Sequence, residues 1–139
     1  MFTYVCLGTR DLKRASKFYD ATMGALGYQR CVTGDPEWDR TWAGWGTYEN
    51  RGAREIALWV GKPFDEQLAT VGNGTMVALA AKSWQQVDAF HAAAVGSGGR
   101  SDGPPGLRLQ YYPDFYAAYV RDPDGNKLAV VCRGFTTPQ

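Results

Sequence analysis

Apolar and polar residues alternate along several short segments of the chain and recur at helical spacing in two longer ones. Residues 4–8 and 76–80 alternate as strands do. Residues 12–22 and 84–94 carry apolar side chains at intervals of three and four, which predicts two amphipathic helices. The pattern therefore predicts a strand followed by a helix, twice.

The two halves match when the sequence is shifted against itself by 72 residues, without a gap. Seven identities recur in order: Val5 on Val77, Leu7 on Leu79, Phe18 on Phe90, Ala21 on Ala93, Gly24 on Gly96, Gly27 on Gly99 and Ala57 on Ala129. Asp11 and Ser83 precede the helices as N-caps, and glycines follow both helices. We predict one domain over 1–139, with internal modules of about 1–62 and 74–135.

Strand signals follow each helix. The candidates are Tyr28 to Thr33, Thr41 to Tyr48 and Glu55 to Val60 in the first half, and Phe115 to Val120 and Lys127 to Cys132 in the second. A further short strand in the second half is interrupted at Asp102–Gly106. Each half is then a βαβββ module, and the fold class is α+β.

Alternation along the strands separates two faces. One is uniformly apolar and should pack on the helices: Val5, Leu7, Ile56, Leu58, Val60, Val77, Leu79, Leu128 and Val130. The other mixes aromatic, small and charged residues: Tyr4, Cys6, Glu55, Ala57, Trp59, Met76, Ala78, Lys127, Ala129 and Val131. The mixed face suits a concave surface that meets a ligand.

Composition narrows the function classes. The chain has 15 Lys and Arg against 14 Asp and Glu, so no broad basic field exists for nucleic acid. No apolar run exceeds six residues, so we expect neither a membrane span nor a signal peptide and place the protein in the cytoplasm. The three cysteines lack metal or disulfide spacing, and one histidine cannot make a multi-histidine metal site.

The arrangement resembles the vicinal oxygen chelate superfamily, which includes glyoxalase I, extradiol dioxygenases and bleomycin-resistance proteins. Leu7–Asp20, with its Phe18-Tyr19 pair, is similar to the family's first strand and helix. Pro105–Asn126, which ends in Asp-Pro-Asp-Gly-Asn, is similar to a glyoxalase-like subgroup. The resemblance implies two βαβββ modules that curl into an incomplete, curved mixed-sheet barrel with helices outside.

The resemblance also implies a divalent metal held by the first and fourth strands of each module. Those positions are Tyr4 and Ala57 in the first half and Met76 and Ala129 in the second. Alanine has no donor atom, and a thioether suits soft copper(I) better than harder ions. We therefore expect no metal cofactor, with a displaced site at Glu55 or Cys6 as the alternative.

Four other side chains are candidates for chemistry. Trp59 lies on the mixed face and is a candidate for the pocket. Tyr112 stands where the subgroup often has histidine. Tyr4, Met76 and Tyr112 together could line the site of an apolar ligand, or they could simply pack. Arg108 could pair with a ligand carboxylate or with one of ten aspartates. His91 falls on a helix, where an edge position away from the concave face is expected.

We expect a metal-free protein that binds a small apolar or aromatic molecule at Tyr4, Cys6, Glu55, Ala57, Trp59, Met76, Arg108, Tyr112 and Ala129. A homodimer is expected, with no nucleic-acid or membrane partner. The alternative is a glyoxalase-like lyase or isomerase that acts through a displaced metal or through Tyr4, Tyr112 and Arg108. A third hypothesis is an inactive dimerisation partner of an active relative.

Overall fold

A computed structural model describes residues 1–138. Its elements in chain order are β1 (Tyr4–Gly8), α1 (Leu12–Ala25), α2 (Pro36–Asp39), β2 (Trp42–Glu49), the short 3₁₀ turn η1 (Asn50–Gly52), β3 (Arg54–Gly61), β4 (Met76–Ala80), α3 (Trp84–Gly96), β5 (Arg100–Leu107), β6 (Tyr116–Arg121) and β7 (Lys127–Cys132). The strand and helix that open each half are confirmed.

The strands form two separate sheets. The first has the order β1-β3-β2 and the second β4-β7-β6-β5, and in each the opening strand runs parallel to its neighbour while the other pairs are antiparallel. The α+β class is therefore confirmed: residues 1–138 form two mixed sheets of three and four strands and no closed barrel.

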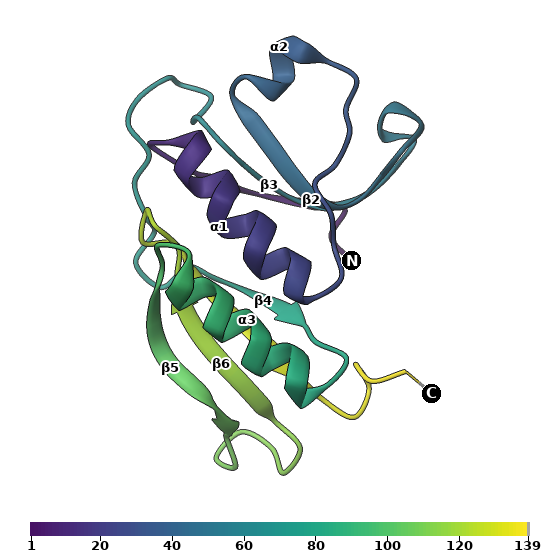
Figure 1. Ribbon diagram of the computed structural model, residues 1–139, viewed down its shortest axis with the longest axis vertical. Coiled ribbons are helices and arrows are strands. Elements are labelled where there is room, and N and C mark those ends of the chain that lie inside the picture. The colour runs from purple at the N-terminus through teal and green to yellow at the C-terminus, as the bar shows by residue number, and fades with distance from the viewer. Residues whose placement is uncertain (139) are drawn as a thin grey trace.

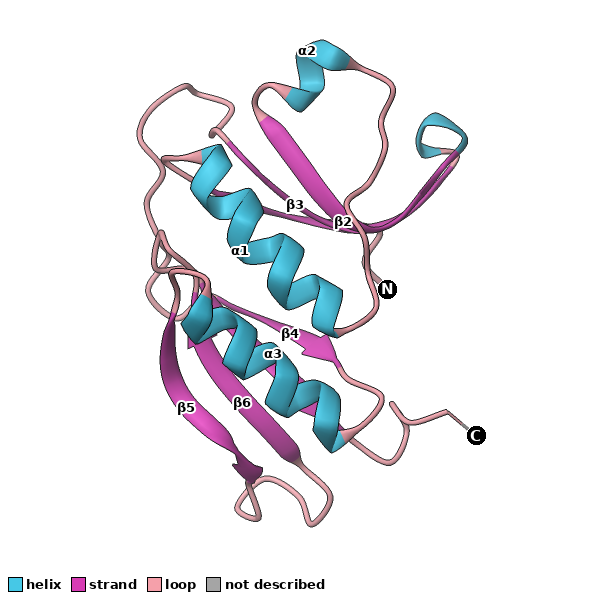
Figure 2. Cartoon of the chain, in the orientation of Figure 1, coloured by secondary structure: helices cyan, strands magenta, loops and turns pink. Residues whose placement is uncertain are grey.

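The two long helices lie side by side, each against its own sheet (Figures 1 and 2). The Asp11 side chain accepts a hydrogen bond from the Arg14 N–H at 3.0 Å, and Ser83 Oγ accepts one from Gln86 N–H at 3.2 Å, so both predicted N-caps are confirmed. The largest fully buried side chains, among them Trp45, Tyr19 and Phe90, lie between the helices and the sheets.

The turn that follows β6 joins the two halves. The buried Asp122 carboxylate accepts hydrogen bonds from the Tyr19 hydroxyl at 2.7 Å and the Asn126 amide at 2.9 Å. Asp124 in the same turn accepts from the Arg10 N–H and pairs with Arg14 at the start of α1. The Asp-Pro-Asp-Gly-Asn motif therefore fixes the second half onto the first helix.

The prediction of a strand at Tyr28–Thr33 is wrong. Only Arg30 forms a bridge, to Trp45, and the Cys31 N–H donates to Gly44 O at 2.8 Å. The segment reaches the β2 edge and then leaves it for α2, which the sequence pattern had not indicated and which starts at Pro36 behind the Asp35 cap. The first half is therefore one strand short of βαβββ.

Two further expectations need correction in the second half. The predicted interruption at Asp102–Gly106 does not end the strand: β5 continues through it, and its register against β6 shifts there. The gapless 72-residue match also fails in the last strand. Tyr4 pairs with Ala57, but Met76 pairs with Lys127, and Ala129 pairs with Ala78 two residues further along.

Candidate functional site

Trp38, Trp42 and Trp59 cover the face of the first sheet that points away from α1. Trp59 is 3% exposed. Its ring lies directly over Gly44 on the paired strand β2, where any side chain would collide with it, because a Cβ at Gly44 would come within 2.7 Å of the ring. Trp38 and Tyr48 meet Trp59 edge to face, with ring centroids 5.9 and 5.4 Å away. Trp59 therefore covers this face and, within residues 1–138, lines only a small pocket of about 150 Å³ beside Gly44 and Trp42.

Glu55 and Cys6 lie close together at the edge of this sealed face. Glu55 Oε1 accepts the Trp59 indole N–H at 2.7 Å. Burial, and then the charge of Glu55, raise the pKa of the Cys6 thiol, and the same two effects raise the pKa of Cys31, although its backbone hydrogen bond opposes them. Raised pKa values leave both thiols protonated near neutral pH, which makes them weak nucleophiles and weak ligands.

A groove of about 690 Å³ runs between β1 and β4, the neighbouring edges of the two sheets. It brings together three of the positions that the resemblance indicated, Tyr4, Ala57 and Met76. Ile56 also lines it and is 60% exposed, so the expectation that Ile56 packs under a helix is wrong. Helix α1 reaches the groove only at Met23, near its C-terminus, which leaves this end of the first sheet uncovered.

A second hollow, of about 640 Å³, opens on the face that the second sheet turns away from α3. Met76 lines both spaces, so the groove and the second hollow adjoin. Arg108, Lys127 and Tyr119 form its centre, and the guanidinium carbon and the ammonium nitrogen lie 5.5 and 5.6 Å from the Tyr119 ring centroid. Lys127 and Tyr119 were not among the predicted site residues.

Asp102 is the acid of the second hollow. Its carboxylate accepts from Arg121 Nε at 3.0 Å and lies 3.4 Å from Lys127 Nζ. Burial would raise the pKa of Asp102, but the Arg121 hydrogen bond and the Lys127 ammonium outweigh it and hold that pKa below its usual value. Burial raises the pKa of the Tyr119 phenol, which the nearby Arg108 charge only partly offsets. At neutral pH the hollow therefore holds an ionised acid and a neutral phenol.

Some predicted residues lie elsewhere. The Tyr112 ring lies 4.8 Å from the Arg133 guanidinium and lines neither space, so it does not join Tyr4 and Met76. Ala129 is 1% exposed beside Tyr119.

His91 lies on the helix side, as expected. Its Nε2 is 2.7 Å from Ser101 Oγ on β5, and it lines neither the groove nor the second hollow. Burial lowers the His91 pKa, although the charge of Asp88 opposes the shift. His91 is therefore a neutral edge residue near pH 7, remote from both spaces.

The donor set does not fit a divalent metal at the positions that the resemblance implies. Ala57 and Ala129 have no donor atom, and Tyr4 and Met76 offer a phenol and a thioether instead of the carboxylate, imidazole or thiolate that divalent ions prefer. Nowhere in residues 1–138 do three or more His, Cys, Asp or Glu side chains gather closely enough to hold an ion. The displaced site would need a third ligand beside Glu55 and Cys6.

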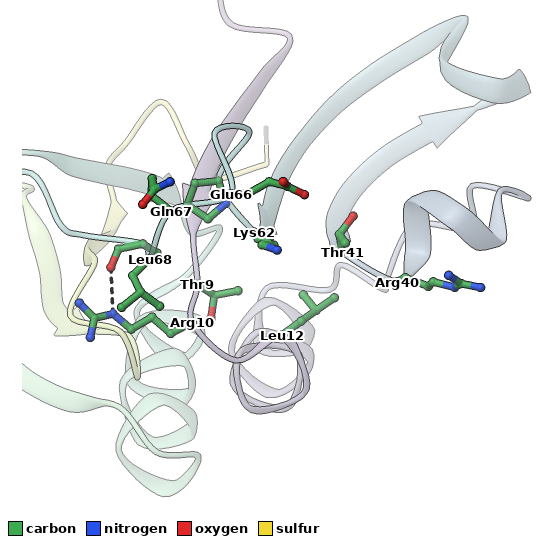
Figure 3. Close-up of a pocket in the computed structure, with 11 residues that line it drawn as sticks. Thr9, Arg10, Leu12, Arg40, Thr41, Lys62, Glu66, Gln67 and Leu68 are labelled. Atoms are coloured by element: carbon green, nitrogen blue, oxygen red, sulfur yellow. Dashed lines mark hydrogen bonds between the residues drawn. The ribbon is translucent and has the colours of Figure 1, made fainter.

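A smaller pocket of about 240 Å³ lies at the start of α1, against the segment that follows β3 (Figure 3). Arg10 donates from Nε to Ala69 O at 2.9 Å, and the side chains of Lys62 and Glu66 are exposed around it. None of the predicted site residues lines this pocket. It has a mixed polar and apolar lining and shares no residue with the groove or the second hollow.

A family model and a solved structure indicate the same superfamily. The model of the Glyoxalase/Bleomycin resistance protein/Dioxygenase superfamily matches residues 2–130. A glyoxalase/bleomycin resistance protein from Albidiferax ferrireducens T118 is 37% identical over 96% of this chain and 98% of its own, with a TM-score of 0.77. No curated protein matches the chain.

Two more distant structures share the fold. A glyoxalase-related enzyme from Fulvimarina pelagi is 17% identical over 96% of this chain and 88% of its own, with a TM-score of 0.68. A glyoxalase I mutant from Zea mays is 24% identical over 93% of this chain but only 45% of its own, with a TM-score of 0.60. Within residues 1–138, neither long helix has the length and apolar character needed to cross a bilayer.

Proposed function

Because the chain belongs to the glyoxalase/bleomycin resistance protein/dioxygenase superfamily, and its own residues do not fit that family's metal site, we propose that it binds a small molecule without a resident metal. The observation that carries the proposal is the groove of about 690 Å³ at Tyr4, Ala57 and Met76. Its lining includes no carboxylate, imidazole or thiolate among residues 1–138, and it surrounds a space large enough for a ligand.

The lining of the groove indicates what kind of molecule would enter it. Phe2, Tyr4, Ile56 and Met76 are 70%, 55%, 60% and 45% exposed, so apolar surface faces solvent on both sides of the groove. Contiguous exposed apolar surface is typical of binding sites, and Met and aromatic side chains adapt to planar ligands. We expect an apolar or aromatic molecule; a homodimer and a cytoplasmic location also stay predictions.

The test combines metal analysis with a binding screen on purified, untagged protein. We expect less than about 0.1 mole of any divalent ion per mole of protein, and a raised Tm with at least one planar aromatic compound, because binding to the native state alone stabilises it. A stoichiometric ion that resists dialysis, and whose removal abolishes binding, would contradict the proposal.

A variant that fills the groove locates the binding. Ala78 is exposed on β4 and lines the groove, so Ala78→Trp should abolish the Tm shift of a compound that binds there. Ala92→Trp is the matched control, because Ala92 is also exposed but lies on α3. An equal Tm shift in both variants would place the ligand outside the groove.

A further inference from the structure

The Arg108 guanidinium is held in place by the backbone of β5 and has no acidic partner. Its two terminal nitrogens donate to Gly106 O at 2.8 Å and Pro104 O at 2.6 Å. No ion pair in residues 1–138 includes Arg108. A guanidinium has five N–H donors, so three remain for another acceptor. Of the two pairings expected for Arg108, the one with an aspartate is therefore ruled out for the described residues.

The sequence of β5 makes this arrangement possible. A Cβ at Gly106 would lie 3.1 Å from one terminal nitrogen of Arg108, and a Cβ at Gly103 3.4 Å from the other. Larger residues would push the guanidinium away from the strand. Register shifts against β6 occur over the same stretch, which turns carbonyl groups toward Arg108 instead of into the ladder. The Gly-Pro-Pro-Gly segment thus presents a fixed, half-buried positive charge.

The surroundings of Arg108 combine positive charge with aromatic surface. Lys127 adds a second cation, and the one acid of the hollow, Asp102, is already shared between Lys127 and Arg121. The rings of Tyr111, Phe115 and Tyr119 and the side chain of Met76 form the rest of the lining. The cations exceed the acid, so the hollow favours an anion, and a bare inorganic anion would leave the rings without a partner.

We propose that the second hollow binds a planar ligand that carries a carboxylate, with Arg108 as the anchor for that carboxylate; this rests on the proposed small-molecule function. The planar fork of an arginine matches the two oxygens of a carboxylate, and a prearranged guanidinium loses little conformational freedom on binding. Lys127 adds a second positive charge 5.6 Å from the Tyr119 ring centroid, and the ring system of the ligand lies against the aromatic lining and Met76.

The experiment compares 1-naphthoate with its neutral isostere 1-naphthamide by isothermal titration calorimetry. Wild type should bind the acid at least about ten-fold more tightly than the amide, the size expected for one charge-assisted hydrogen-bonded pair. Arg108→Met should remove this preference while the affinity for the amide changes less than about two-fold. Arg100→Met, which removes an equal charge from an exposed position on β5 outside the hollow, should keep the preference.

Each result decides the inference. Equal binding of acid and amide by wild type would overturn the carboxylate anchor but leave small-molecule binding intact. Absence of binding by both compounds would also overturn it, and the metal analysis and aromatic screen would then judge the proposed function separately. An equal loss in Arg108→Met and Arg100→Met would show a general charge effect instead of an anchor. If Arg108→Met does not fold, Arg108→Lys should fold and keep only part of the preference, and an unchanged preference would contradict the anchor.

Discussion

The faces that the two sheets turn away from the helices are covered in different ways. In the first sheet, Trp59 lies across Gly44 and is enclosed by Trp38 and Tyr48, with its indole N–H bound to Glu55. In the second sheet, the Tyr119 ring lies 5.5 and 5.6 Å from the charged groups of Arg108 and Lys127 and lines an open hollow. The two halves of the repeat therefore differ: one face is covered by packed rings, and the other holds the open hollow for which we propose a ligand.

The same contrast appears in the acids of the two faces. Glu55 accepts the hydrogen bond of the buried Trp59 indole, and its charge raises the pKa of the Cys6 thiol. It therefore helps to hold Trp59 in place over the first sheet. Asp102 is held ionised by Arg121 and Lys127 and only partly balances the cations of the hollow. The two carboxylates thus have different roles, because Glu55 is half-buried against packed rings and Asp102 is exposed at an open hollow.

The largest expected effect comes from removing the tryptophan that closes the first face. Trp59→Ala should lower the free energy of unfolding by about 3–5 kcal/mol, because it leaves a cavity and strips Glu55 of its donor. Tyr119→Ala should cost only about 1–2 kcal/mol, because its ring already contacts solvent. Urea unfolding followed by circular dichroism measures both; equal losses would remove the contrast between a packed face and an open one.

A smaller effect is expected from the acid of the open face. Asp102→Asn should raise the affinity for 1-naphthoate about two-fold to five-fold, because it removes a negative charge and frees Lys127 and Arg121 to attract the carboxylate. Asp114→Asn is the control, since Asp114 pairs with Arg133 and lines neither space. Calorimetric titration that shows weaker binding for Asp102→Asn would contradict the proposed charge balance.

The smallest expected effect concerns the single histidine, which belongs to neither face. Burial depresses the folded-state pKa of His91, so the unfolded chain binds the proton more tightly. The stability from this group is present above the unfolded pKa of about 6.5 and is lost as pH falls through the folded pKa. His91→Gln should therefore show a shallower loss of stability than wild type between about pH 7.5 and 5.5 in urea unfolding. Identical slopes would show that another group controls this window.

Much of the fold could be predicted because its signals are local. Strand alternation fixed Tyr4–Gly8, Met76–Ala80 and Lys127–Cys132 to the residue, and the caps at Asp11 and Ser83 set where the helices begin. The failure at Tyr28–Thr33 has a tertiary cause. Its backbone reaches the β2 edge at Arg30 and Cys31, and the chain then turns into α2, so β-propensity alone could not decide it.

The candidate site was only partly predictable. Tyr4, Ala57 and Met76 do meet in one groove: alternation gave their strand faces, and the family resemblance implied that these strands share a site. Trp59 and Tyr112 were placed on the site by face or by resemblance, but ring packing around Trp59 and the Arg133 contact of Tyr112 hold them elsewhere. Lys127 and Tyr119 were missed, although Lys127 shares the mixed face with Met76 in the sequence pattern.

The sequence by itself determined the two-module plan, the caps and the poor ligands for divalent ions at Tyr4, Ala57, Met76 and Ala129, because these depend on residue type and near neighbours. Only the tertiary structure decided which face is closed and which is open. That depends on how rings such as Trp59 fold back over glycines and on the two-residue register shift that sets Lys127, instead of Ala129, beside Met76. Such contacts join residues far apart in the chain, where residue pattern carries no distance information.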